Sequence, residues 1–173
     1  MLKLLRRTDI LALLDELGIT TSTRDHHAVF TVAESEALHR EIAGAHTKNL
    51  FFKDAKGALF LLVAEAHAEI DLKRLHRVIG CARLSFGRPE LLMDVLGVTP
   101  GSVTAFSIVN DADHRVTLLL DATLARADVI NCHPMTNDAT TSIRRQDLLR
   151  FFEHCGHPPK VVDLAATPPE VRS

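Results

Sequence analysis

The sequence contains neither tryptophan nor tyrosine, and its eight phenylalanines are the whole of its 5% aromatic share. A protein that stacks a run of nucleic-acid bases on aromatic side chains needs more rings than this. An excess of positive charge is also missing, because 20 lysines and arginines face 22 acidic residues, for a net charge of −2. Any contact with a polyanion must therefore be made by a local patch.

Cysteine is scarce and irregularly placed. Cys81, Cys132 and Cys155 are an odd number, and no two of them form a C-x-x-C pair. This pattern argues against a disulfide framework and favours a reducing compartment. The longest apolar run, residues 58–64, is too short for a bilayer. Residues 1–18 mimic a secretion signal only faintly, because acidic side chains interrupt their leucines, so we expect an amphipathic helix and a cytoplasmic protein.

The composition, 46% apolar and 24% charged, suits one globular domain, expected to span residues 1–173 with a frayed tail over 166–173. Periodicity and capping signals predict helices over residues 8–17, 32–44, 71–81, 88–97 and 146–156. Apolar and β-branched runs predict strands over residues 28–32, 50–52, 58–64, 103–109, 115–121, 127–134, 139–144 and 160–164. Because these elements alternate irregularly, we expect an α+β fold, with a mixed, largely antiparallel sheet or partial barrel and helices packed outside.

Several familiar catalytic motifs are missing, namely G-x-G-x-x-G, a Walker loop, a G-x-S-x-G elbow and H-E-x-x-H. Three weaker features remain. The first is "GVTPGSV", where Pro100, Gly101 and Ser102 form a tight loop before an apolar run. Backbone N–H groups of such a loop can converge on an anion or a developing oxyanion, although a Pro-Gly pair more often marks a structural turn.

The second feature pairs "NCHP", residues 131–134, with "EHCGH", residues 153–157. Two cysteines and three histidines suggest zinc, but Cys132 and His133 are consecutive on a predicted strand and should point to opposite faces. Neither segment has the ligand spacing of a structural zinc site, so we expect no metal there. A cysteine hydrolase is equally weakly supported, because no local signature surrounds Cys132 or Cys155.

The third feature is a basic segment over residues 71–88. Lys73, Arg74 and Arg77 occupy neighbouring positions of a predicted helix, and Arg83 follows it. A basic run is usually a solvated face. In a slightly acidic chain, it is also the best candidate for a local phosphate-binding patch.

In their combination and order, the motifs resemble a known family. The resemblance is carried by "HTKNLFFKDAKG", "LGVTPGSVTAF", "VINCHPMTNDATTSI" and "DLLRFFEHCGHPPKVVDL". These segments are similar to the YbaK/prolyl-tRNA-synthetase-associated domain family, and most of all to its free-standing PrdX or ProXp-ala branch. The resemblance covers roughly residues 5–165 and implies a YbaK-like fold.

The resemblance also implies an activity, that of a trans-editing aminoacyl-tRNA deacylase, typically one that hydrolyses alanine from the tRNA for proline. A synthetase pocket built for proline rejects alanine poorly, because each missing methylene changes binding by only about 1–3 kcal/mol, so a second, hydrolytic sieve is needed. The implied partners are mischarged tRNA and, as a candidate, prolyl-tRNA synthetase. No cofactor, membrane or sequence-specific DNA contact is expected. Two alternatives stay open: a deacylase for cysteine or serine, and a non-catalytic tRNA-binding module that docks to a synthetase.

The family's site residues carry over to matching positions. Lys48 matches the essential lysine, whose ammonium would hold the phosphate or ribose of the terminal adenosine, and Asn49 would add a hydrogen bond. Gly101 and Ser102 match the Gly-Ser loop, whose N–H groups would polarise the ester carbonyl or position water. His133 matches the histidine that shapes the amino-acid pocket. No residue matches a general base, so the resemblance favours substrate-assisted, metal-independent hydrolysis beside the ribose 2′-hydroxyl.

Further residues are implied around the same site. Phe30 and Thr31 lie in the family's pocket-lining segment. Arg83 and the basic helix before it would contact the acceptor stem of the tRNA. Ala105 stands where the family loop commonly has proline, a departure that could loosen the loop.

Overall fold

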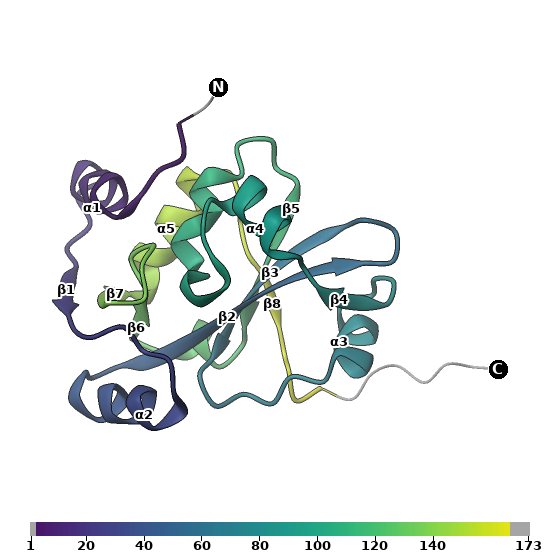
Figure 1. Ribbon diagram of the computed structural model, residues 1–173, viewed down its shortest axis with the longest axis horizontal. Coiled ribbons are helices and arrows are strands. Elements are labelled where there is room, and N and C mark those ends of the chain that lie inside the picture. Colours follow the sequence, from purple (N-terminus) through teal and green to yellow (C-terminus); the bar gives the residue numbers. More distant parts are fainter. Residues whose placement is uncertain (1–2, 167–173) are drawn as a thin grey trace.

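A mixed sheet runs through the middle of the molecule, and helices cover both of its faces (Figure 1). The computed structural model describes residues 3–166. The helices are α1 (Arg7–Glu16), α2 (Val32–Glu41), α3 (Leu72–Ile79), α4 (Pro89–Leu96) and α5 (Arg145–His154), with 3-10 turns η1 (Pro100–Ser102), η2 (Ala105–Asn110) and η3 (Leu124–Arg126). The strands are β1 (Ser22–Asp25), β2 (Ala45–Asp54), β3 (Leu59–Glu65), β4 (Leu84–Phe86), β5 (Val116–Asp121), β6 (Val129–Cys132), β7 (Ala139–Arg144) and β8 (Lys160–Val162).

The strands lie in the order β1-β7-β6-β2-β3-β5-β8, with β4 added to β2. Within residues 3–166, four of the strand pairs are antiparallel and three are parallel. The long strand β2 is shared by three neighbours, since it pairs with β6 at its start, β3 along most of its length and β4 at its end. The predicted α+β fold with a mixed sheet and helices outside is therefore confirmed.

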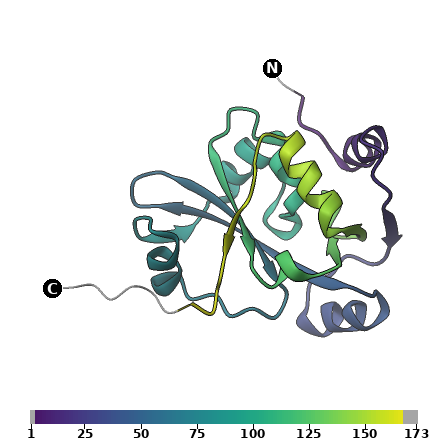
Figure 2. The same ribbon diagram turned by 180° about the vertical axis from the view of Figure 1, so that it is seen from behind.

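The apolar run of β3 is continuous because both faces of this strand are buried. Leu61 and Val63 face a core that is completed by α1, α4, η2 and α5. Phe60 and Leu62 face a second core, on the opposite side, which α3 covers. Figure 2, seen from behind, shows α5 lying across its side of the sheet.

Helix α2 differs from the other helices because none of its residues is buried. Figure 1 shows it at the margin of the molecule, beside the start of β2. Thr31 caps it as predicted, since the Thr31 hydroxyl accepts a hydrogen bond from the Glu34 N–H at 3.2 Å and donates one to the Glu34 carboxylate at 2.8 Å. The turn into β2 requires Gly44, which has φ +108°, and where a Cβ would lie 2.9 Å from Asn131 Nδ2.

Some sequence predictions are wrong. Residues 103–109, predicted as a strand, lie mostly in the 3-10 turn η2, which begins with the Phe106 N–H donating to the Thr104 hydroxyl. Residues 28–32 form no strand either, because the chain is irregular up to Thr31 and helical from Val32. The strands β1 and β4 were not predicted. Of the predicted frayed tail, residues 167–173 lie outside the described residues.

The helices within residues 3–166 do not combine the length and the apolar character needed to cross a membrane.

Candidate active site

A small cavity of about 70 Å³ lies between α2 and the sheet. One side of it, named here the sheet wall, is made by Thr47, Asn131, Cys132, His133 and Thr140. The opposite side, named the helix wall, is made by Ser35, Leu38 and His39 of α2. The cavity thus lies between strands that are held in the sheet and a helix at its margin.

Hydrogen bonds fix the sheet wall. The buried Asn131 side chain donates to the carbonyl oxygens of Ala43 and Ala45 at 3.1 and 3.2 Å and accepts from the Ser142 hydroxyl at 2.5 Å. The Thr47 hydroxyl donates to the Asn131 carbonyl at 2.8 Å. The start of β2 is therefore tied to β6 through side chains as well as through the strand pairing.

His133 lies in this wall directly after β6. Its Nδ1 is 3.1 Å from the Ala139 carbonyl oxygen, and its own carbonyl accepts a hydrogen bond from the Thr104 hydroxyl at 2.5 Å. Burial lowers the pKa of His133 below its ordinary value, with a smaller opposing effect from the bond to Ala139. The ring is therefore neutral near pH 7, with Nδ1–H donating to the carbonyl and the lone pair on Nε2.

Lys48 and Asn49 follow Thr47 on β2, but they do not line the cavity. The half-buried Lys48 ammonium donates to the Ala68 carbonyl, on the face of β2 opposite to Thr47. The Asn49 amide donates to the Thr47 hydroxyl at 3.4 Å. Its Oδ1 is buried and has no hydrogen-bond partner among residues 3–166, which leaves an acceptor beside Thr47.

Gly101 and Ser102 form the 3-10 turn η1, outside the cavity. The Ser102 N–H donates to the Thr99 carbonyl at 2.9 Å, so this donor is already used. Gly101 stands at the start of the turn, where N–H groups have no acceptor within the helix. The hydrogen bond from Thr104 to the His133 carbonyl joins this loop to the sheet wall.

Phe30 and Thr31 stand at the start of α2, away from the cavity lining. The Phe30 side chain is 82% exposed, and the Thr31 side chain is the helix cap described above. Val29 lines the cavity instead. The role that the family resemblance implies for Phe30 and Thr31 therefore stays a prediction, and neither residue lines this cavity.

The predicted basic residues lie on and after α3. Lys73, Arg77 and Arg83 are exposed, and the part of the chain that the structure describes gives them no ion pair. The Arg74 guanidinium instead donates to the carbonyl oxygens of Ala165 at 2.7 Å and Ala166 at 3.1 Å. Three of the four predicted cations are therefore free to meet an anion, and the fourth holds the chain after β8.

The cysteine-histidine segments are not brought together as a metal site. His157 is buried, and its Nε2 lies 2.9 Å from Asp111 Oδ2 while its Nδ1 lies 2.9 Å from the Cys155 carbonyl oxygen. Burial raises the pKa of both the Cys132 and the Cys155 thiol to about 12, so neither is a ready nucleophile at neutral pH.

Sequence reasoning missed a different group, made by Glu36, His39 and His67. The ligand atoms of these three side chains lie within 4.8 Å of one another. The Glu-x-x-His spacing on one helix face was a readable signal for two of them. Nothing in the sequence placed His67 beside them.

The comparisons with known proteins lead to a tRNA-editing family and to proteins named after prolyl-tRNA editing or prolyl-tRNA synthetase. Residues 26–151 match the family described as "Aminoacyl-tRNA editing domain". The chain is 37% identical to prolyl-tRNA synthetase associated domain-containing protein 1 of Danio rerio, over 91% of this chain and 87% of that protein. It is 35% identical to the prolyl-tRNA editing protein ProX of Acetoanaerobium sticklandii, over 90% of this chain and 95% of that one. A crystal structure of a candidate trans-editing enzyme for prolyl tRNA synthetase shares the fold, with a TM-score of 0.67 at 19% identity over 93% and 98% of the two chains.

Proposed function

The chain belongs to the aminoacyl-tRNA editing domain family, and on that premise we propose that it is a trans-editing deacylase that hydrolyses alanine from mischarged tRNA for proline. Membership confirms the family resemblance expected from the sequence motifs. The substrate of the proposed reaction is the ester between alanine and the terminal ribose of the tRNA.

The observation that carries the proposal is the size of the cavity. At about 70 Å³ it is far below the roughly 300–1,000 Å³ of pockets that hold drug-sized ligands, and it suits a side chain of very few atoms. A pocket that admits alanine and excludes proline by size is what a second sieve requires. In this proposal, the neutral His133 ring and Leu38 limit the size of the side chain that enters.

Positioning and polarisation would supply the chemistry. The Lys48 ammonium would exchange the Ala68 carbonyl for the phosphate or ribose of the terminal adenosine, a stronger, charge-assisted contact where it meets phosphate. The unpartnered Asn49 Oδ1 would accept a hydrogen bond from the α-ammonium group of the amino acid.

The Gly-Ser loop would act on the reacting carbonyl. The Gly101 N–H and the Ser102 hydroxyl are its remaining donors, because the Ser102 N–H is bound to Thr99. Such donors stabilise the oxyanion that develops when water attacks an ester. The ribose 2′-hydroxyl next to the ester would assist the water, so the proposed mechanism needs neither a protein base nor a metal.

Binding of the tRNA body is assigned to the exposed cations after β3. Lys73, Arg77 and Arg83 would meet acceptor-stem phosphates, and Arg74 would join them only by releasing its two carbonyl partners.

The test is ester hydrolysis with alanyl-, cysteinyl-, seryl- and prolyl-tRNA for proline at saturating enzyme. We expect fast loss of alanine and little loss of proline. Faster loss of cysteine or serine would show that the protein is a deacylase with a different amino-acid specificity. Tight tRNA binding without hydrolysis of any ester would instead identify a binding module that docks to a synthetase.

A further inference from the structure

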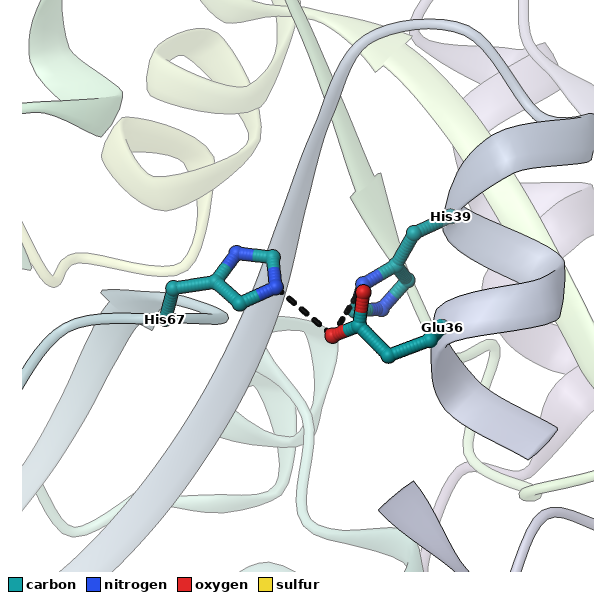
Figure 3. A group of neighbouring side chains, drawn as sticks. All are labelled: Glu36, His39 and His67. Carbon is teal, nitrogen blue, oxygen red and sulfur yellow. Dashed lines mark hydrogen bonds and ion pairs between the residues drawn. The ribbon is translucent and has the colours of Figure 1, made fainter. Parts of the chain in front are cut away.

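Three side chains that could bind a metal ion meet beside the cavity. Glu36 and His39 lie one turn apart on α2, and His67 lies in the turn after β3. Figure 3 shows the Glu36 carboxylate between the two imidazole rings. Glu36 Oε1 is 2.7 Å from His67 Nε2 and 3.8 Å from His39 Nδ1.

The His39 ring is available as a ligand. Its Nδ1 is buried and has no hydrogen-bond partner among the described residues, which is an unfavourable state for a polar atom. The neighbouring His46 ring has its centroid 4.2 Å from that of His39. His46 is occupied elsewhere, because its Nε2 lies 2.8 Å from the Ile42 carbonyl oxygen.

The Glu65 carboxylate orients the His67 ring from the side opposite to Glu36. His67 Nδ1 lies 3.1 Å from Glu65 Oε1, and this carboxylate directs the opposite nitrogen, Nε2, toward Glu36. A carboxylate behind a histidine is the usual support of a metal-binding imidazole.

Helix α2 is held weakly against the rest of the protein, because none of its residues is buried. Its other cross-links in residues 3–166 include the ion pair of Arg24 with Glu41 at 2.8 Å, which is largely exposed and contributes little. A metal held by two residues of α2 and one residue of the turn after β3 would join the helix wall directly to the sheet.

We propose that Glu36, His39 and His67 form a binding site for a divalent transition-metal ion of the zinc class, which fastens α2 over the cavity. Two imidazoles and one carboxylate are a ligand set that zinc accepts, with water in the fourth position. Ligands bound at about 2.0–2.2 Å lie no more than about 4 Å apart, so only small side-chain rotations are needed to enclose the ion.

This site is separate from the proposed hydrolysis. Lys48, Gly101 and Ser102 are not among its ligands, and the ion acts on the position of α2. The experiment can therefore be done on the full chain without tRNA, and its result does not depend on the proposed function.

The direct test is titration of the metal-free chain with Zn²⁺, and with Co²⁺, whose visible absorption reports four-coordinate binding. We expect one ion per chain. His67→Ala and Glu36→Gln should each weaken binding at least about 100-fold, since even residues behind the ligands typically contribute 10–100-fold. His67 is exposed, so its replacement should leave the fold intact, which a thermal melt checks. His154→Ala, at an exposed histidine at the end of α5, is the matched control and should bind as the wild type does.

Hydrogen exchange gives a second readout. Zinc should slow the exchange of the α2 amides in the wild type and not in His67→Ala. The absence of stoichiometric binding, or equal affinity in the wild type and both ligand variants, would overturn the proposal and leave Glu36 and His67 as an ion pair only. Binding that leaves α2 exchange unchanged would refute the fastening.

Discussion

The two walls of the cavity are built in opposite ways. In the sheet wall, the Asn131 side chain is 2% exposed and joins three segments by hydrogen bonds. The helix wall belongs to α2, which has no buried residue and lies at the edge of the molecule. In the proposed sieve, the space for the amino-acid side chain would therefore be set by one firmly held wall, which includes His133, and one loosely held wall, which includes Leu38.

Because the two walls are held differently, substitutions in them should affect different properties. Substitutions on β2 and in the sheet wall should affect chemistry or stability, because these residues are held by many partners. Substitutions on α2 should affect which amino acid is hydrolysed from the tRNA, because this helix can shift with little loss of stability.

The largest effect is expected on β2. Lys48→Ala should slow single-turnover hydrolysis of alanyl-tRNA about 100-fold or more, because losing the contact to the terminal adenosine misplaces the ester, and a misplacement of about 1 Å can cost that much. Lys48→Arg should rescue poorly, because a planar guanidinium does not replace a compact ammonium in a tight site. The preference for alanine over proline should stay, since Lys48 does not line the cavity.

The matched control for Lys48 is Lys53→Ala, at the exposed end of the same strand, which should hydrolyse at the wild-type rate. Thermal melts of both variants should agree with the wild type to within about 2–4 °C, which corresponds to about 1 kcal/mol for a chain of this size. A Lys48→Ala protein that is normally folded and fully active would leave this lysine with no role beyond its hydrogen bond to Ala68.

A pair of substitutions compares the two walls directly. Asn131→Ala should lower the free energy of unfolding by about 1–3 kcal/mol, because it removes a buried side chain that donates to two backbone carbonyls and accepts from the Ser142 hydroxyl. Leu38→Ala should lower it by less than about 1 kcal/mol but relax the preference for alanyl- over prolyl-tRNA about tenfold. Denaturation curves and ester hydrolysis measure the two effects. Equal destabilisation by both changes would show that the walls are equally firm.

Outside both walls, the basic residues should change binding alone. Arg83→Ala, or Lys73→Ala combined with Arg77→Ala, should weaken tRNA binding and reduce the slope of log affinity against log salt by about 0.7–0.9 per lost phosphate contact. Arg126→Ala, an exposed arginine on η3, is the control. Single-turnover hydrolysis at saturating enzyme should change little. A large fall in this rate with unchanged tRNA binding would show that these cations take part in the reaction.

The pH dependence of stability should report the sheet wall. Burial lowers the pKa of His133 below 6.5, so below that pH the unfolded chain binds a proton that the folded chain does not. This contribution to stability is present above pH 6.5 and is lost as the pH falls toward the folded pKa. Between pH about 7.5 and about 5.5, the free energy of unfolding measured with urea should therefore fall less in His133→Gln than in the wild type. An identical loss would mean that His133 is charged in the fold.

The smallest effect is expected from chelation. Exhaustive EDTA treatment should leave the saturating rate of hydrolysis almost unchanged, because the proposed metal ligands are not the residues assigned to the reaction. Loss of activity that zinc restores would connect the helix wall to the chemistry and refute the substrate-assisted mechanism.

Much of the fold could be predicted because its elements carry local signals. Thr31 caps α2, Asp71 caps α3 and Gly97 ends α4, as their residue types indicated. Residues 103–109 were wrongly predicted as a strand because Ala105–Ile108 are buried throughout. An apolar run without alternation does not distinguish a strand from a tight helical turn. The strand β4 has three residues, too few for any period to show.

The candidate site was less accessible to sequence reasoning. Motif matching proposed His133, which the structure places in the cavity wall, and Lys48, whose role stays a prediction. It could not find Asn131 as the residue that joins β6 to β2, because its partners, Ala43 and Ala45, are backbone groups more than 80 residues away. Contacts of this kind follow from topology and leave no local pattern.

The pairing of β2 with β6 also has a consequence for the order of folding. The β2–β3 hairpin is local in the chain, whereas the Ala45–Ile130 and His46–Asn131 pairs join segments far apart in sequence. Closing such a loop is slow, because its entropy is lost before the contact forms. A chain emerging from the ribosome would expose both strands of this hairpin well before residues 129–133 were synthesised. The cavity, whose lining joins residues 46–47 to residues 131–133, would then form only after most of the described chain had been made.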